Sequence, residues 1–164
     1  MEALKTKPTA EHALGDETFM SAAELGAYTA ELKGAKARQA GDRVDKARAE
    51  LIERLSEPVE LTPKTVHEIT QSLLHKLRIA AEQGNNELLV MRFPDVMCSD
   101  GGRAINNFEK DWPDTLTGRP RQAFEFWRDR LQPAGYGLKA MIVDWPDGMP
   151  GDAGLFLTWE TRRV

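Results

Sequence analysis

The 164-residue sequence has a single cysteine and no long apolar run. These two features argue against a disulfide-bonded protein, a cysteine-built metal site and a membrane-spanning protein. Cys98 alone cannot form an intrachain disulfide or a cysteine-built metal site, so we expect a reducing, cytoplasmic location. No apolar run approaches the length that spans a bilayer, so no membrane association is expected. The first residues also lack the apolar stretch of a signal peptide.

A surplus of basic residues is missing as well. The chain has 22 Lys and Arg against 26 Asp and Glu, a formal net charge of −4. General nucleic-acid binders usually carry a basic surplus, so the charge argues against a nucleic-acid partner. The segment 33–48 is rich in Lys and Arg, but it also contains Asp42 and Asp45. Such a mixture is typical of an exposed helix face.

Aromatic residues are scarce in the first part of the chain. Only Phe19 and Tyr28 precede Leu61, and all four Trp follow it. Because bulky side chains bury the most apolar area, the hydrophobic core is predicted after Leu61. The first part is expected to be helical and to bury its apolar side chains by a route other than an aromatic core of its own.

The N-terminal part divides into a tail and a helical arm. Residues 1–20 show no periodicity and are predicted to form a flexible tail. In residues 21–57, Ser21 and Glu24 have the spacing of a capping box, and Gly41 leaves open one bent helix or a helical hairpin. The apolar stripes are narrow, which suits a helix that packs on a partner helix. The candidate contact residues of this arm are Leu25, Tyr28, Leu32, Val44, Leu51 and Leu55.

Residues 62–164 are predicted to form one globular domain. Thr62 and Pro63 have the pattern of a helix start, and Gly84 suits the residue that follows a helix end. "NELLVMRF" predicts a buried strand that stops at Pro94. A short helix capped by Ser99 or Asp100 is expected next.

The rest of this domain is predicted to be a helix followed by a hairpin. Pro120 is expected to open an amphipathic helix. "GLKAMIV" and "GLFLTWE" alternate with period two and predict an antiparallel pair of strands. The order α-β-α-α-β-β indicates an α+β fold, with helices on one face of a small, mostly antiparallel three-stranded sheet.

The string "DWPD" occurs twice, around Trp112 and around Trp145, and is interpreted as turn chemistry. Both Trp are expected to anchor loops on the core, and "WPDG" predicts a type I turn with Pro146 second and Gly148 last. The spacing of the nearby carboxylates does not match an EF-hand loop, so no metal site is predicted. Whether the two loops meet is left open. Their acids are Asp111, Asp114, Asp144, Asp147 and Asp152.

The segment "CSDGGR" is the most chemically suggestive stretch. Glycines and amides at a helix start can bind an anion, and a Cys there can have a lowered pKa. The competing interpretation is a capped helix after a turn, with the thiol as a small buried apolar group. The candidate binding residues are Cys98, Ser99, Asp100, Gly101, Gly102 and Arg103.

Two functional hypotheses follow. The first is a non-enzymatic adaptor or regulatory protein that acts through protein–protein contacts of its helical arm, with another protein or with a second copy. The alternative is a small anion- or phosphate-binding protein or enzyme centred on residues 98–103. No catalytic residue and no cofactor are predicted, and the sequence leaves open whether the chain is an enzyme.

Overall fold

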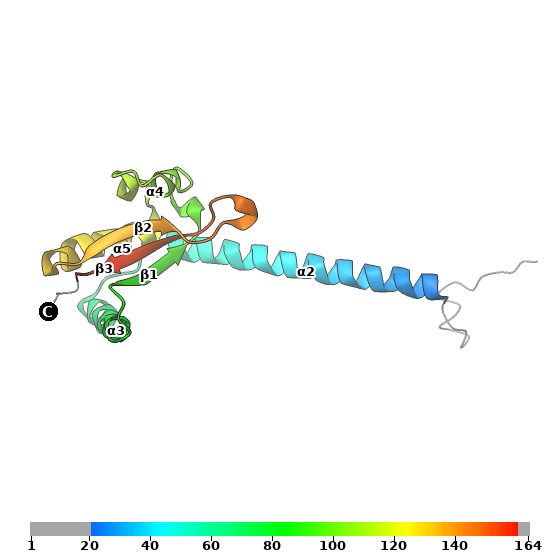
Figure 1. The fold of residues 1–164 in the computed structure, drawn as a ribbon, viewed down its shortest axis with the longest axis horizontal. Helices are drawn as coiled ribbons and strands as arrows, with labels where there is room; N and C mark the ends of the chain where they lie inside the picture. The colour runs from blue at the N-terminus through cyan, green and yellow to red at the C-terminus, as the bar shows by residue number, and fades with distance from the viewer. Residues whose placement is uncertain (1–20, 161–164) are drawn as a thin grey trace, which may run out of the picture. The chain divides into compact units, whose positions relative to one another are not determined.

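A computed structural model describes residues 21–160, and its helices and strands are labelled from α2 onward (Figure 1). The chain divides into two compact units, Met1–Ala49 and Glu50–Val164. The predicted tail, residues 1–20, lies outside the described residues.

Helix α2 spans Ala22–Ser56 without interruption, so the helical hairpin that the sequence left open is not formed. Its start is a capping box, as predicted. The Glu24 amide donates to Ser21 Oγ at 3.1 Å, and the Ser21 amide donates to the Glu24 carboxylate at 2.9 Å. These two bonds satisfy amides that have no partner inside the helix.

Helix α3 spans Pro63–Glu82 and confirms the predicted boundaries. The hydroxyl of Thr62 accepts from the Thr65 amide at 3.1 Å, and Pro63 occupies the first turn, where a missing N–H costs nothing. Gly84 follows the helix with φ +83°, a left-handed conformation that favours glycine.

The sheet contains β1 (Glu87–Phe93), β2 (Gly137–Ile142) and β3 (Ala153–Thr158). The strand order is β1-β3-β2, and both pairs are antiparallel (Figure 1). The α+β class and the predicted hairpin are therefore confirmed. The expectation that β1 is buried is wrong for most of the strand, because only Phe93 is buried and Leu89 and Val90 are exposed. β1 is an edge strand, and its register shifts between Leu89 and Met91, as at a β-bulge.

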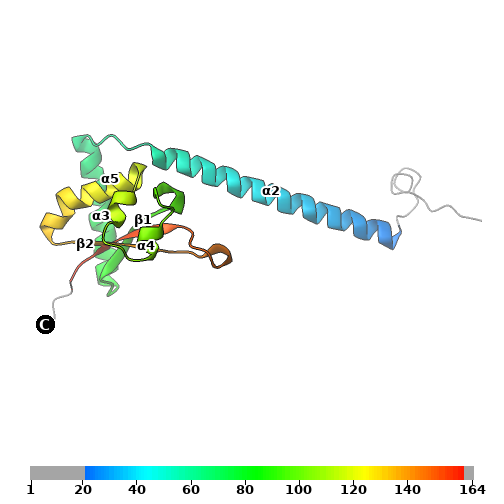
Figure 2. The same ribbon diagram turned by 90° about the horizontal axis from the view of Figure 1, so that it is seen from above.

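Two further helices follow β1. α4 is one short turn, Arg103–Asn106, and α5 spans Gly118–Phe126, two residues earlier than the predicted start at Pro120. α5 continues as a π-helical turn over Trp127–Leu131. Figure 2 shows α5 next to α3 in the view from above. The remaining turns are 3₁₀ helices at Asp95–Met97, Trp112–Thr115, Gln132–Ala134 and Pro146–Gly148.

The core of the second unit lies between one sheet face and the helices. Phe93 and Leu155 are fully buried, and Ile105 of α4 packs with them. The end of α2 belongs to this core, because Leu51, Ile52 and Leu55 pack into it.

Glycine at position 118 permits a close approach within this core. Gly118 has φ +58°, and a Cβ added there would collide with the carbonyl oxygen of Leu55 and crowd Cα of Ser56. A side chain at position 118 would therefore separate α5 from the last turn of α2. The sequence did not predict this contact.

The two Trp of the repeated string behave differently. Trp112 is half-buried against the core, with its ring edge-on to Phe124 at a centroid distance of 5.9 Å, so it anchors its loop as expected. Trp145 is 53% exposed, so the anchoring prediction for it is wrong. The predicted type I turn is wrong too, because Asp147 has φ +52°, whereas that position of a type I turn needs about −90°.

Candidate functional site

The part of α2 in the first unit makes no core of its own. None of residues 21–49 is buried. Leu25, Tyr28 and Leu32 are 53%, 51% and 44% exposed. Their spacing of three and four residues places them within roughly 60° of one another around the helix axis. We refer to Leu25, Tyr28 and Leu32 as the α2 apolar face.

The other residues predicted for the interaction arm lie elsewhere. Val44 is 66% exposed but follows Leu25 by 19 residues, which turns it roughly 100° away around the helix. Leu55 is only 8% exposed, and Leu51 packs against the same core. The structure therefore assigns Leu51 and Leu55 to the second unit's own core. The six residues predicted for one interaction arm therefore lie in three separate environments.

The charge of α2 changes sign along its exposed part. In residues 21–32 the charged side chains are Glu24 and Glu31. In residues 33–41 they are Lys33, Lys36 and Arg38. The apolar face therefore lies in an acidic stretch that is followed directly by a basic one. Such an arrangement is complementary to a reversed copy of itself.

The thiol of the "CSDGGR" segment is poorly placed for chemistry. Cys98 is 3% exposed and pairs with Leu116 in an isolated antiparallel bridge. The Ser99 amide donates to the Thr115 carbonyl at 2.7 Å, which fixes the segment against the loop before α5. Burial raises the pKa of the Cys98 thiol to about 11. The thiolate, the form that reacts, is therefore disfavoured at neutral pH.

The amides that could bind an anion here already have an acceptor. Asp100 Oδ1 accepts from the Gly102 amide at 3.0 Å, and Asp100 Oδ2 accepts from the Ala104 amide at 2.8 Å. The N-cap position of α4 is occupied by Gly102, and Asp100, one of the two residues that the sequence allowed, supplies the capping carboxylate from two residues before it. Its carboxylate occupies the place of an external anion. The Arg103 side chain is exposed. The geometry favours the interpretation of a capped turn.

Two acids of the second "DWPD" loop, Asp144 and Asp152, pair with one strand residue. Arg92 of β1 donates through Nε to Asp152 at 3.0 Å and through Nη2 to Asp144 at 3.1 Å. The hydrogen bond with Asp152 raises the pKa of Arg92 above its ordinary value. Within residues 21–160, no group of three or more His, Cys, Asp or Glu could hold a metal ion. These carboxylates fasten the β2–β3 loop to β1.

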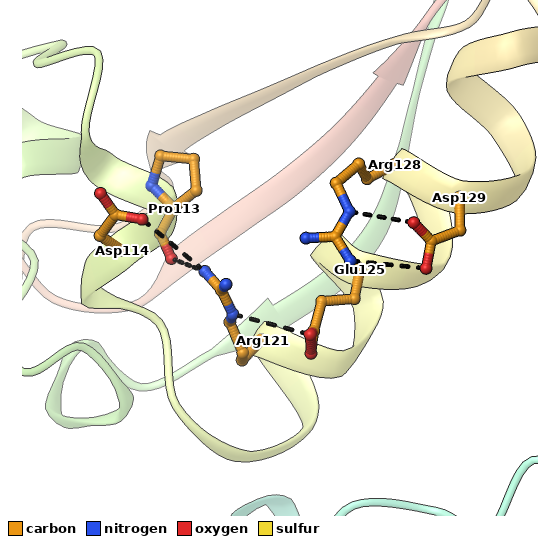
Figure 3. Close-up of polar contacts among 6 residues, drawn as sticks. All are labelled: Pro113, Asp114, Arg121, Glu125, Arg128 and Asp129. Atoms are coloured by element: carbon orange, nitrogen blue, oxygen red, sulfur yellow. Dashed lines mark hydrogen bonds and ion pairs between the residues drawn. The ribbon is translucent and has the colours of Figure 1, made fainter.

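The first "DWPD" loop is fastened by α5 in the same manner (Figure 3). Arg121 donates to the Pro113 carbonyl at 2.8 Å, and its guanidinium lies 4.0 Å from Asp114 and 3.9 Å from Glu125. The same guanidinium lies 5.3 Å from the ring centre of Phe124. Each "DWPD" loop is thus held by its own arginine, and these contacts fix the loops in place.

An apolar groove between α3 and α5 was missed by the sequence reasoning. It has a volume of about 500 Å³, and its floor is formed by Leu155 and Leu157 of β3. Ile69 of α3 also lines the groove and is exposed there. Periodicity identifies the face of a helix but not how closely two helices meet. The groove wall also includes Val59, Leu61, Leu73, Val90, Phe126 and Trp127.

The sequence matches no family model, and comparisons with curated proteins and with solved structures find no match. Within the described residues, no helix is long and apolar enough to cross a membrane.

Proposed function

We propose that this chain is a non-enzymatic adaptor or regulatory protein, and that the α2 apolar face is its protein-docking surface. The observation that carries the proposal is the exposure of Leu25, Tyr28 and Leu32 on one side of a helix with no buried residue between 21 and 49. The cytoplasmic location remains part of the proposal, since it fits a chain whose one thiol, Cys98, is buried and unbridged.

The spacing of the α2 apolar face supports a helical mode of docking. Apolar anchors at i, i+3 and i+7 are those by which an amphipathic helix contacts a groove or another helix. Each of the three side chains still has about half of its surface to bury. Complete burial of that remainder contributes on the order of 1 kcal/mol per side chain. A contact with so small a free energy per side chain suits a partner that binds reversibly.

The alternative centred on residues 98–103 has less support. A nucleophile needs an accessible thiolate, whereas Cys98 is buried and its pKa is raised to about 11. An anion site needs unoccupied amides, whereas Asp100 accepts the two amides at the turn. No described observation offsets these two features.

Site-specific photo-crosslinking in cells tests the docking surface. A photoreactive amino acid is introduced at Tyr28 in one variant and at Ala37 in a control. Both positions are exposed, and nine residues separate them, so they lie on roughly opposite sides of the helix. We expect protein adducts from position 28, several-fold fewer from position 37, and loss of the former when Leu25 and Leu32 are both replaced by Ser. Equal yields at the two positions, or no adduct at either, contradict the proposal.

A further inference from the structure

We infer that the partner of the α2 apolar face is a second copy of this chain, paired with it in antiparallel orientation. The inference rests on the proposed function, because it names the occupant of that docking surface. It is carried by three observations on α2: the extent of the apolar seam, the polar residues that end the seam, and the change in charge along the helix.

The apolar seam is short and symmetric enough to pair with a reversed copy. Leu25, Tyr28, Leu32 and Ala35 follow one another at spacings of three, four and three residues, the pattern of a coiled-coil seam. An antiparallel pair centred near Ala30 places Leu32 of each copy against Tyr28 of the other. The same register places Leu25 of each copy against Ala35 of the other. All four layers are therefore apolar.

The residues that continue the seam select the orientation. After Ala35, the next seam positions are Gln39, Asp42 and Lys46. A parallel, in-register pair would place Asp42 against Asp42 and Lys46 against Lys46 next to the apolar layers. Like charges in such positions are unfavourable. The antiparallel pair centred near Ala30 places these charged positions beyond the paired seam.

The charge distribution agrees with the same orientation. In an antiparallel pair, the acidic stretch 21–32 of one copy faces the basic stretch 33–41 of the other, with Glu24 beside Arg38. Glu31, next to the two-fold axis, faces its own copy. In a parallel pair, Glu31 would instead face Lys36 of the other copy. Neutralising Glu31 therefore has opposite effects in the two orientations.

Sedimentation velocity of the purified full chain over a wide concentration range tests the association. We expect a reversible monomer–dimer equilibrium that is weakened at least tenfold by Leu25→Ser with Leu32→Ser. Val44→Ser is the matched control. It also replaces an exposed apolar residue of α2, but one outside the seam, and should leave the equilibrium unchanged. A chain that stays monomeric at every concentration, or equal effects of the seam and control variants, overturns the inference.

Two measurements test the orientation. Glu31→Gln should strengthen the antiparallel dimer, and a weakened dimer would contradict it. Copies with Leu25→Cys and copies with Ala35→Cys are then mixed and oxidised. The antiparallel pair predicts disulfides between position 25 of one copy and position 35 of the other, whereas 25–25 and 35–35 disulfides contradict it. The native Cys98 should not interfere, because it is buried.

The failures of the two proposals are distinguishable. A purified chain that is monomeric throughout, combined with adducts to a different protein at position 28 in cells, overturns the second-copy inference and retains the docking surface. No adduct at position 28, together with a monomeric chain, overturns both. Adducts between two copies at position 28, combined with a dimer that the seam variants weaken, support both.

Discussion

The two parts of helix α2 differ in what stabilises them. In residues 22–49 every side chain is exposed or only half-buried, whereas in residues 50–56 the helix contributes Leu51, Ile52 and Leu55 to a core. Helix α2 is therefore stabilised mainly by interactions between nearby residues in its first part and by core packing in its last part. Full burial of one leucine contributes about 1.5–3 kcal/mol, a gain that residues 22–49 do not obtain from the described part of the chain. The comparison shows where the chain has apolar surface left for a partner.

The largest effect is expected in the packed part, at Gly118. Gly118→Ala should lower the free energy of unfolding by about 4 kcal/mol, because the positive φ is strained for alanine and the new Cβ meets the Leu55 carbonyl. Chemical denaturation measures the loss. Gly135→Ala is the control, since Gly135 also has a positive φ but has open space around it, and should cost about 1 kcal/mol. Equal losses would show that the close approach of α2 and α5 is unimportant.

Truncation of a leucine in each part of α2 tests the comparison directly. Leu55→Ala should destabilise the second unit by about 3 kcal/mol, because Leu55 is buried. Leu25→Ala should change the stability of the dilute, monomeric chain by less than about 0.5 kcal/mol, because Leu25 is exposed. Denaturant titration at low protein concentration measures both. A Leu25 effect as large as that of Leu55 would mean that residues 22–49 are packed by their own chain.

A smaller, pH-dependent effect is expected from Cys98. Burial raises the pKa of this thiol from 9.0 to about 11, so the folded chain keeps its proton where the unfolded chain has lost it. Stability should therefore be unaffected by this group below about pH 9 and should fall as the pH rises toward 11. Comparison of the chain with its Cys98→Ala variant between pH 8 and pH 11 isolates the contribution. A thiol that alkylates rapidly at pH 6 would contradict its burial and revive the nucleophile hypothesis.

The smallest effect is expected in the exposed part of α2. Gly41→Ala should stabilise the helix by about 0.5–1 kcal/mol, because no atom of the chain outside the helix backbone lies near the new Cβ. Circular dichroism during thermal unfolding measures the gain. Position 41 lies away from the α2 apolar face, so self-association should not change. Loss of association in this variant would indicate that the docking surface lies on the other side of the helix.

Local signals in the sequence were sufficient for much of the fold. The capping box at Ser21, the Thr62–Pro63 start of α3 and the period-two runs of β2 and β3 all depend on residues close together in the chain. Predictions from such features hold in the folded chain because hydrogen bonds and backbone preferences within a few residues decide the local structure. The α+β class and the antiparallel sheet followed from them.

The candidate site could not be predicted as well, because contacts between distant residues decide it. Leu25 and Leu55 look alike in a helical stripe, yet only Leu55 meets a core. Asp100 was one of the candidate anion-binding residues, and it proved to be the acceptor of the local amides. Trp145 carries the same flanking residues as Trp112 but has no core beside it. The groove between α3 and α5 depends on helix separation, which periodicity does not encode.

The most direct test of the central claim is amide hydrogen exchange of the full chain and of its Leu25→Ser, Leu32→Ser variant at high protein concentration. If residues 22–49 are held by a contact outside their own chain, their amides should be more protected in the unaltered chain, and dilution should remove the difference. The protection of the β3 amides should be the same in both chains. Equal protection of residues 22–49 in the two chains at every concentration would contradict the claim that the α2 apolar face is a docking surface for a second copy.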